Sequence, residues 1–76
     1  MDEATEQSIK RLIAAQLQID IGKVTPSSRF IEDLKADSLD LIEIIMALEE
    51  QFGKDIPDEQ AEKLLTVQSV MDYFDE

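Results

Sequence analysis

Residues 37–53 read DSLDLIEIIMALEEQFG and are the most informative stretch of the chain. Large apolar residues recur in it at spacings of four, three and four positions, which is the repeat of a helix that packs one face against a core. These residues are Leu41, Ile45, Leu48 and Phe52, with Ile44 beside them. The stretch therefore predicts a helix with a buried stripe.

The two ends of this helix carry their own signals. Asp37 is the natural N-cap, and Asp40 stands three residues later in the relation of a capping box, where Glu or Gln is more usual. Gly53 supplies a C-terminal stop. This assignment puts Ser38 at the first helical position.

The hydroxyl of Ser38 has two interpretations. A serine just before a helix most often caps that helix itself, with its hydroxyl bonded to the backbone. Because Asp37 can already fill that role, the Ser38 hydroxyl can instead stay exposed at the helix N-terminus. The helix dipole and the unpaired amides there favour a phosphate ester. The residues alone leave both the cap and the modified serine open.

One side of the same helix carries carboxylates. At about 100° per residue, Asp40, Glu43 and Glu50 align opposite the apolar stripe. Leu39 and Met46 lie at the edge of this acidic strip. Charges that steer a partner, next to apolar side chains that supply contact area, are typical of a docking surface. An ordinary solvated helix face is the alternative, although the helix contains no Lys or Arg that would pair with the acids.

The remaining segments are also helical or loop-like. We expect an amphipathic helix over 3–18, a turn-rich loop over 20–36, a short helix over 57–63 that starts at Pro57, and a last helix capped by Thr66. Four apolar residues should anchor the long loop in the core, namely Val24, Phe30, Ile31 and Leu34. The prediction is an all-α fold: a small four-helix bundle of three longer helices and one short helix, with a long loop between the first two, as a single domain over 1–76.

Composition excludes several functions. The 76 residues include 7 Lys plus Arg against 18 Asp plus Glu, a net charge of −11, with no Cys, His or Trp. This charge argues against nucleic acid and against anionic membrane surfaces, and it favours positively charged protein partners. Without Cys and His the chain lacks thiol nucleophiles, hydrolytic triads and zinc sites. The small size of the chain also argues against a multi-step enzyme. No apolar run suits a membrane span and the start MDEATEQ is acidic, which predicts a soluble, cytoplasmic protein. Nothing in the sequence suggests more than a monomer.

The charge is concentrated in the second half of the chain. Residues 1–36 carry six acids and five bases and net −1, whereas residues 37–76 carry twelve acids and two bases and net −10. Repulsion among these acids lowers stability, so their concentration suggests a function, with solubility as the alternative.

The segment FIEDLKADSLDLIEIIMALEEQFGKDIPDEQAEKLLTVQSVMDYF, residues 30–74, resembles the acyl carrier proteins of type II fatty acid synthesis. A lone DSL is a weak signal, but DSLD together with FIEDL, KDIPDE and LTVQSV is specific. The resemblance implies a 4′-phosphopantetheine arm, derived from coenzyme A, on Ser38. It also explains the absence of Cys, because the arm supplies the thiol that carries acyl groups as thioesters.

The resemblance further implies partners and lining residues. A phosphopantetheinyl transferase and the basic surfaces of fatty acid synthesis enzymes would recognise a face made of Asp37, Leu39, Asp40, Glu43, Met46, Glu49 and Glu50. The acyl thioester cargo would slip between the helices, lined by Ile44, Ile45, Ile56 and Leu64.

The sequence departs from the family at Lys35, where relatives usually have Gly. The substitution puts partner preference in question more than attachment itself. Carrier proteins of polyketide, peptidyl or D-alanyl transfer use the same modified serine and remain alternatives. So does an acidic divalent-ion-binding or charge-mimic protein, although the acids do not follow EF-hand spacing.

Overall fold

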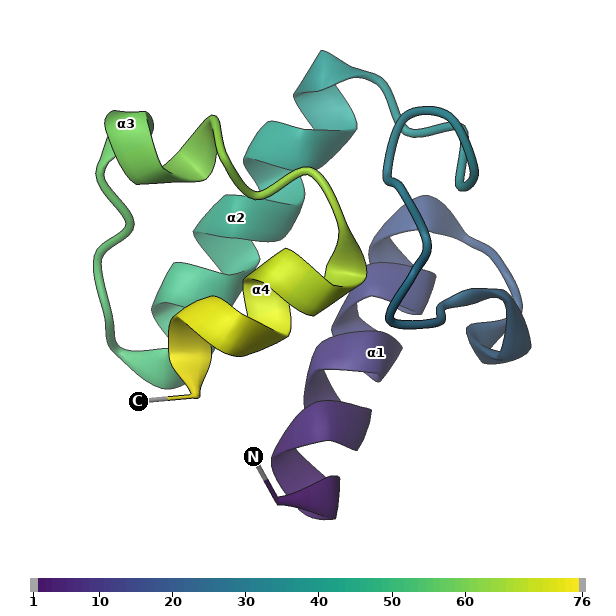
Figure 1. The fold of residues 1–76 in the computed structure, drawn as a ribbon, viewed down its shortest axis with the longest axis horizontal. Coiled ribbons are helices and arrows are strands. Elements are labelled where there is room, and N and C mark those ends of the chain that lie inside the picture. The colour runs from purple at the N-terminus through teal and green to yellow at the C-terminus, as the bar shows by residue number, and fades with distance from the viewer. Residues whose placement is uncertain (1, 76) are drawn as a thin grey trace.

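The computed structural model describes residues 2–75. Within them lie four α-helices and one short 3-10 helix: α1 (Glu3–Leu17), η1 (Ile21–Lys23), α2 (Ser38–Phe52), α3 (Asp58–Ala61) and α4 (Val67–Phe74). In Figure 1 α4 crosses in front of α2, α3 lies beside the upper part of α2, and the long loop after α1 covers the opposite side. The predicted all-α bundle, with its one short helix and its long first loop, is confirmed.

A single cluster of buried apolar side chains joins these elements. Its members come from all three longer helices and from the loops: Ile9, Ile13, Ala14, Val24, Phe30, Leu34, Ala36, Ile44, Leu48, Ile56, Leu64, Val67, Val70 and Met71. The long loop therefore contributes core residues of its own, as predicted, because a loop of this length must bury apolar side chains to stay ordered.

The buried stripe of α2 is centred differently from the predicted one. Ile44 and Leu48 are 1% and 0% exposed, whereas Leu41, Ile45 and Phe52 are only partly buried. The reason is that α1 packs against one side of α2, while Leu41 and Ile45 face a groove beside α3. The helical spacing correctly predicted which side of α2 faces the rest of the protein. It did not predict which residues on that side would be most deeply buried, because that depends on where α1 packs.

The prediction for Ile31 was wrong. Its side chain is 46% exposed, while Phe30 and Leu34 on either side are buried. The backbone N–H groups of Asp33 and Leu34 both donate to the carbonyl oxygen of Arg29, so the chain forms a helix-like turn here. In such a turn, residues four apart lie on the same side, so Phe30 and Leu34 both face the core. Ile31 comes directly after Phe30 and therefore points to solvent.

The short helix is also shorter than predicted. Pro57 adopts an extended conformation as the N-cap, and α3 begins at Asp58 rather than at Pro57. The N–H of Lys63 still donates to the carbonyl oxygen of Gln60 at 3.0 Å, so the turn continues after α3 without a regular helix. A four-residue helix is too short to be stable by itself, so it depends on the residues before and after it.

The start of α4 is fixed by the long loop. The first two amides of this helix have no partner within it, and they donate to loop carbonyls instead. Val67 N donates to Ser28 O at 3.0 Å, and Gln68 N donates to Pro26 O at 2.9 Å. The loop therefore serves as an N-terminal cap for a helix that lies about forty positions later in the sequence.

Thr66 completes this cap, as predicted. Ser69 N donates to Thr66 Oγ1 at 3.1 Å, and Thr66 N donates to Ser69 Oγ at the same distance. Thr66 also forms an isolated β-bridge with Arg29, and no strand occurs within residues 2–75.

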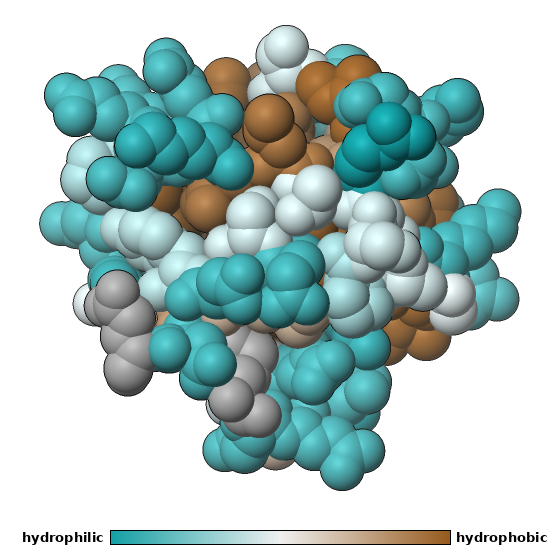
Figure 2. Space-filling view, in the orientation of Figure 1, coloured by the Kyte–Doolittle hydropathy of each residue, from teal (hydrophilic) through white to brown (hydrophobic). Residues whose placement is uncertain are grey.

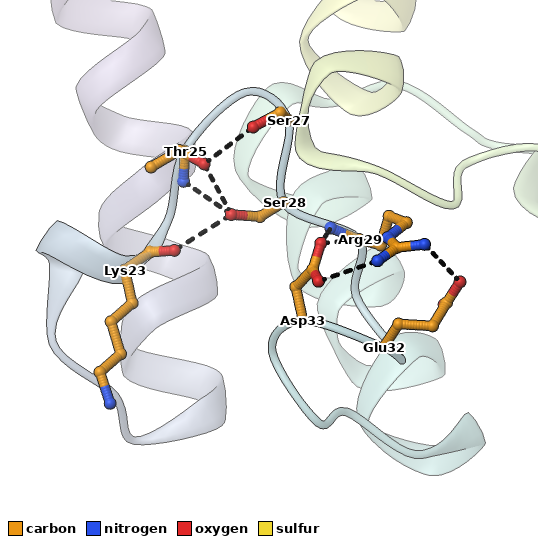
Figure 3. A network of polar contacts seen from close by, with 7 residues as sticks. All are labelled: Lys23, Thr25, Ser27, Ser28, Arg29, Glu32 and Asp33. Carbon is orange, nitrogen blue, oxygen red and sulfur yellow. Dashed lines mark hydrogen bonds and ion pairs between the residues drawn. The ribbon is translucent and has the colours of Figure 1, made fainter.

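A buried serine organises the middle of the long loop. Ser28 is 7% exposed, and its hydroxyl donates to Lys23 O at 3.1 Å (Figure 3). The same oxygen accepts the backbone N–H of Thr25 at 3.1 Å and lies 2.8 Å from the Thr25 hydroxyl. With its hydrogen bonds made, this polar group can be buried without a desolvation penalty.

An ion pair closes the next turn. Arg29 donates to Asp33 through its backbone N–H at 2.8 Å and through Nε and Nη2 at 3.2 Å each (Figure 3). The hydrogen bonds from the Arg29 side chain, followed by the one from its backbone, lower the pKa of Asp33 below its ordinary value. The unfolded pKa is about 3.9, so the stabilisation from this carboxylate is present above that pH and is lost as the pH falls through the lower folded pKa.

Lys35 has a left-handed backbone, with φ of 61°. An L-residue in that conformation is strained by about 1–2 kcal/mol, whereas Gly adopts it freely. This geometry would suit the Gly that the family resemblance leads us to expect at this position. We expect Lys35→Gly to raise the free energy of unfolding by about 0.5–1 kcal/mol, because relief of strain exceeds the added entropy of the unfolded chain.

Urea unfolding of the Gly variant measures this gain, with Lys35→Ala as the matched control. Both variants lose the same positive charge, but Ala keeps the strained Cβ. A Gly variant that is no more stable than the Ala variant would contradict the argument from strain.

Candidate functional site

The first turn of α2 leaves the hydroxyl of Ser38 exposed. Asp40 N donates to Asp37 Oδ1 at 2.8 Å, and Asp37 N donates to Asp40 Oδ2 at 3.1 Å, which confirms the predicted capping box. Ser38 is the first helical residue, its side chain is exposed, and no hydrogen bond engages its hydroxyl within residues 2–75. Of the two interpretations of this serine, the structure removes the one in which it is the cap.

An apolar groove opens beside Ser38. Its volume is about 340 Å³, and it runs between α2, α3 and the segment that follows α3. The lining residues are Ser38, Leu41, Ile42, Ile45, Asp58, Ala61, Glu62, Leu64 and Leu65. Figure 2 shows apolar surface at this end of the molecule, framed by hydrophilic side chains. A hydroxyl at the mouth of an apolar groove can hold a covalently attached group whose far end is hydrophobic.

The four residues predicted to line a cargo site divide into two pairs. Ile45 and Leu64 line the groove. Ile44 and Ile56 are 1% and 5% exposed within the core and are absent from the lining. The second pair belongs to the core and does not form the wall of the groove.

A second hollow of about 330 Å³ adjoins the first. It lies between the long loop and α2 and shares Leu41 and Leu65 with the first groove. The exposed Ile31 lines this hollow, so the side chain that we expected in the core contributes to the surface instead.

The carboxylates of α2 accept hydrogen bonds from uncharged donors. Asp40 accepts from its own N-cap, Glu43 accepts from the side-chain amide of Gln16 on α1, and Glu49 accepts from a backbone N–H. Glu50 is exposed and has no hydrogen-bond partner in the described part of the chain. None of the ion pairs found among residues 2–75 involves these side chains, so their negative charge stays at the surface of the helix.

Exposed apolar residues accompany this acidic strip. Leu39 and Met46 are 62% and 61% exposed, as the helical spacing predicted. Sequence reasoning missed Ile42 and Leu65, which are 54% and 58% exposed. Ile42 lies three positions after Leu39 and four before Met46, so the same spacing could have found it. Leu65 lies between α3 and α4, where no periodic signal exists.

Residues 2–75 contain neither a candidate metal site nor a candidate membrane span. No group of three or more His, Cys, Asp or Glu side chains in this range could hold a metal ion. Over the same range no helix is long and apolar enough to cross a membrane.

Comparison with known proteins identifies the family. A sequence family described as "Phosphopantetheine attachment site" matches residues 7–74. The acyl carrier protein of Thermosynechococcus vestitus is 57% identical over 68 residues, which cover 90% of this chain and 84% of that protein. The acyl carrier protein of Helicobacter hepaticus is 54% identical over 71 residues, 93% of each chain, and that of Helicobacter pylori strain G27 is 53% identical over 70 residues, 92% of this chain and 90% of that one.

These matches cover nearly the whole chain at an identity far above what a shared fold alone produces. They confirm the resemblance seen in residues 30–74 and the phosphopantetheine cofactor that it implied, and they identify a carrier rather than an enzyme. The chain therefore belongs to the acyl carrier protein family and contains that family's phosphopantetheine attachment domain.

Proposed function

We propose that Ser38 carries the 4′-phosphopantetheine arm and that the protein delivers growing fatty acyl chains, as thioesters on that arm, to successive enzymes of fatty acid biosynthesis. The observation that supports this most directly is the exposed Ser38 hydroxyl, which has no hydrogen bond in the described residues and lies at the mouth of an apolar groove. The curated relatives are named acyl carrier proteins, which agrees with the proposal.

The first turn of α2 fits a phosphodiester. Ser38 and Leu39 lie at the first two helical positions, where backbone N–H groups have no acceptor within the helix. The positive end of the helix dipole lies at the same place and favours an anion. Asp37 and Asp40 satisfy each other's amides, so their hydrogen bonds leave the serine oxygen available.

Attachment is a substitution at phosphorus. The Ser38 oxygen forms a bond to the phosphorus that bears the pantetheine arm, and the bond between the two phosphates of coenzyme A breaks. Adenosine bisphosphate leaves, and the hydroxyl proton is taken up by the transferase or by water. The attached arm supplies the thiol that the chain itself lacks, since the sequence contains no Cys.

The groove gives the acyl chain a place out of water. Ile45 and Leu64 form part of its apolar wall, whereas Ile44 and Ile56 are buried in the core. Removing apolar surface from water is favourable by about 25 cal/mol per Å², so even partial insertion of a chain is stabilising.

The exposed side of α2, together with Leu65 from the segment after α3, supplies the docking surface. We assign to it the residues proposed from the sequence, together with the two added by their exposure: Asp37, Leu39, Asp40, Ile42, Glu43, Met46, Glu49, Glu50 and Leu65. Unneutralised carboxylates steer the basic surfaces of a phosphopantetheinyl transferase and of synthesis enzymes, and the apolar side chains add contact area. The protein acts as a cytoplasmic monomer with a single domain over 1–76.

Intact-mass spectrometry tests the proposal. Purified protein incubated with coenzyme A and a phosphopantetheinyl transferase should gain the mass of one arm. The loaded protein, given purified bacterial elongation enzymes and a malonyl donor, should then show stepwise lengthening of its acyl chain. If the protein gains the arm but its acyl chain does not lengthen, it is a carrier protein that does not serve fatty acid synthesis.

The charge of Glu43 should govern encounter with partner enzymes. We expect Glu43→Lys to lower the apparent second-order rate of arm transfer about tenfold at low salt, because it reverses a charge at the centre of the acidic strip. The defect should shrink as salt rises, since screening weakens steering in both proteins. Transfer rates measured across a range of salt concentrations report both effects.

The matched control is Glu3→Lys. It makes the same change in net charge at the start of α1, at the opposite end of the molecule from the start of α2 (Figure 1). Equal slowing by the two variants would mean that net charge, rather than the acidic strip, controls encounter.

A further inference from the structure

Glu49 holds the connection between α2 and α3. Its carbonyl oxygen accepts the backbone N–H groups of Gly53 and of Lys54, the latter at 3.2 Å. Its carboxylate oxygen Oε2 accepts the backbone N–H of Ile56 at 2.7 Å. One residue of α2 thus receives three of the four amides between positions 53 and 56.

The helix α3, which follows this connection, has few stabilising interactions of its own. α3 spans only four residues, contains no buried residue and has no side-chain hydrogen bond at its N-cap. Its position depends on the buried residues at its flanks, Ile56 before it and Leu64 after it. The hydrogen bond from Ile56 N to Glu49 joins the first of these flanks to α2.

The groove beside Ser38 depends on the same spacing. Leu41, Ile42 and Ile45 form its wall on α2, and the opposite wall consists of α3 with the segment that follows it. A change in the distance between Ile56 and α2 therefore changes the width of the groove. Glu49 belongs to α2, which forms one wall, and its carboxylate accepts a hydrogen bond from Ile56, which lies just before α3 in the other wall.

Glu49 differs in this respect from its neighbour in the acidic strip. Its side chain is partly buried and hydrogen-bonded, while Glu50 is exposed and has no partner within residues 2–75. A carboxylate bonded to a backbone amide makes a stronger hydrogen bond than a neutral acceptor would.

We propose that Glu49 is a positioning residue that keeps α3 against α2 and so keeps the groove closed over the acyl chain. The part that concerns the acyl chain rests on the proposed function. The part that concerns α3 does not, because the hydrogen bond exists in the protein without its arm.

Amide hydrogen exchange in the unloaded protein tests the anchoring of α3. We expect Glu49→Ala to speed exchange at Ile56 and at the amides of α3 by about ten- to a hundredfold, the effect of losing a hydrogen bond to a charged group. Exchange at the core amides of Leu48 and Val70 should change much less, which separates local release from general destabilisation. Glu49→Gln keeps an oxygen within reach and should restore most of the protection.

Glu50→Ala is the matched control and should leave these exchange rates unchanged. If the Glu49→Ala protein unfolds, Glu49→Asp makes the same comparison, because its shorter side chain cannot reach Ile56 N. Equal exchange at Ile56 in the Glu49 and Glu50 variants, or no rescue by Gln, would overturn the proposal.

Cleavage of the loaded thioester tests the groove. Hydroxylamine should release a decanoyl group several-fold faster from the Glu49→Ala protein than from the wild-type or Glu50→Ala protein. Faster exchange without faster cleavage would show that Glu49 anchors α3 but does not protect the chain, which contradicts the second half of the proposal. If the wild-type protein accepts no arm, the proposed function fails, and the exchange comparison still decides the role of Glu49.

Discussion

Replacing Ser38 by alanine is expected to abolish attachment of the phosphopantetheine arm and to leave the fold intact. Among the residues that line the groove, Ser38 alone carries a hydroxyl group, and the substitution removes it. Stability should change by less than about 0.5 kcal/mol, because the side chain is exposed and its hydroxyl makes no hydrogen bond within residues 2–75. Intact-mass spectrometry after incubation with coenzyme A and a transferase measures the loss, and thermal unfolding checks the fold.

The matched control is Ser27→Ala. Ser27 is also exposed, but it lies in the long loop, where its hydroxyl is 3.4 Å from that of Thr25. This variant should gain the arm as the wild-type protein does. A Ser38→Ala protein that still gains one arm would refute the assignment of the site, and the position of the modified residue would then have to come from peptide fragmentation.

The exposed serine at the start of α2, which we propose as the attachment site, could be predicted from the sequence because its geometry is local. Asp37 and Asp40 are three residues apart, and the hydrogen bonds of a capping box follow from that spacing alone. The same holds for Thr66 at the start of α4 and for Gly53, whose φ of 61° ends α2. Once the cap is assigned, the exposure of Ser38 follows without knowledge of any distant contact.

The groove could not be predicted, because it depends on which elements meet in space. Helical spacing located a buried stripe on α2, but only the packing of α1 makes Ile44 its centre and leaves Ile45 facing the groove. The opposite wall comes from α3 and Leu65, which have no periodic pattern. Glu49 looked like one more member of the acidic strip because its partner, the N–H of Ile56, is seven residues away.

The acidity of the second half of the chain also gains a more specific meaning. From the sequence, the acids had two interpretations: a surface that binds basic partners, or an ordinary solvated helix face. The structure places each carboxylate of α2 in one of two situations: bonded to an uncharged donor, as Glu43 is, or without a partner in the described residues, as Glu50 is. In both situations the charge stays available to a partner, at the cost of repulsion within the helix.

Replacing Phe30 by alanine is expected to give the largest loss of stability in the molecule. Phe30 is 1% exposed and is among its largest fully buried side chains. Truncating a buried Phe to Ala costs about 3–5 kcal/mol, through lost burial and the cavity that remains. Folded domains have only about 5–15 kcal/mol in total, so a large fraction of the stability would be lost. Urea unfolding followed by circular dichroism measures the change.

The loop that Phe30 anchors makes this loss larger than that of an isolated core residue. Phe30 N donates to Leu65 O at 3.1 Å, and Phe30 O accepts from Ala36 N at 2.9 Å. The same loop caps α4, so release of the Phe30 ring frees hydrogen bonds at two helices. Ile31→Ala is the matched control: it removes apolar side-chain atoms from the next position, but Ile31 is 46% exposed and the loss should stay below about 1 kcal/mol. Equal losses in the two variants would mean that the loop is held by its backbone hydrogen bonds and not by the Phe30 ring.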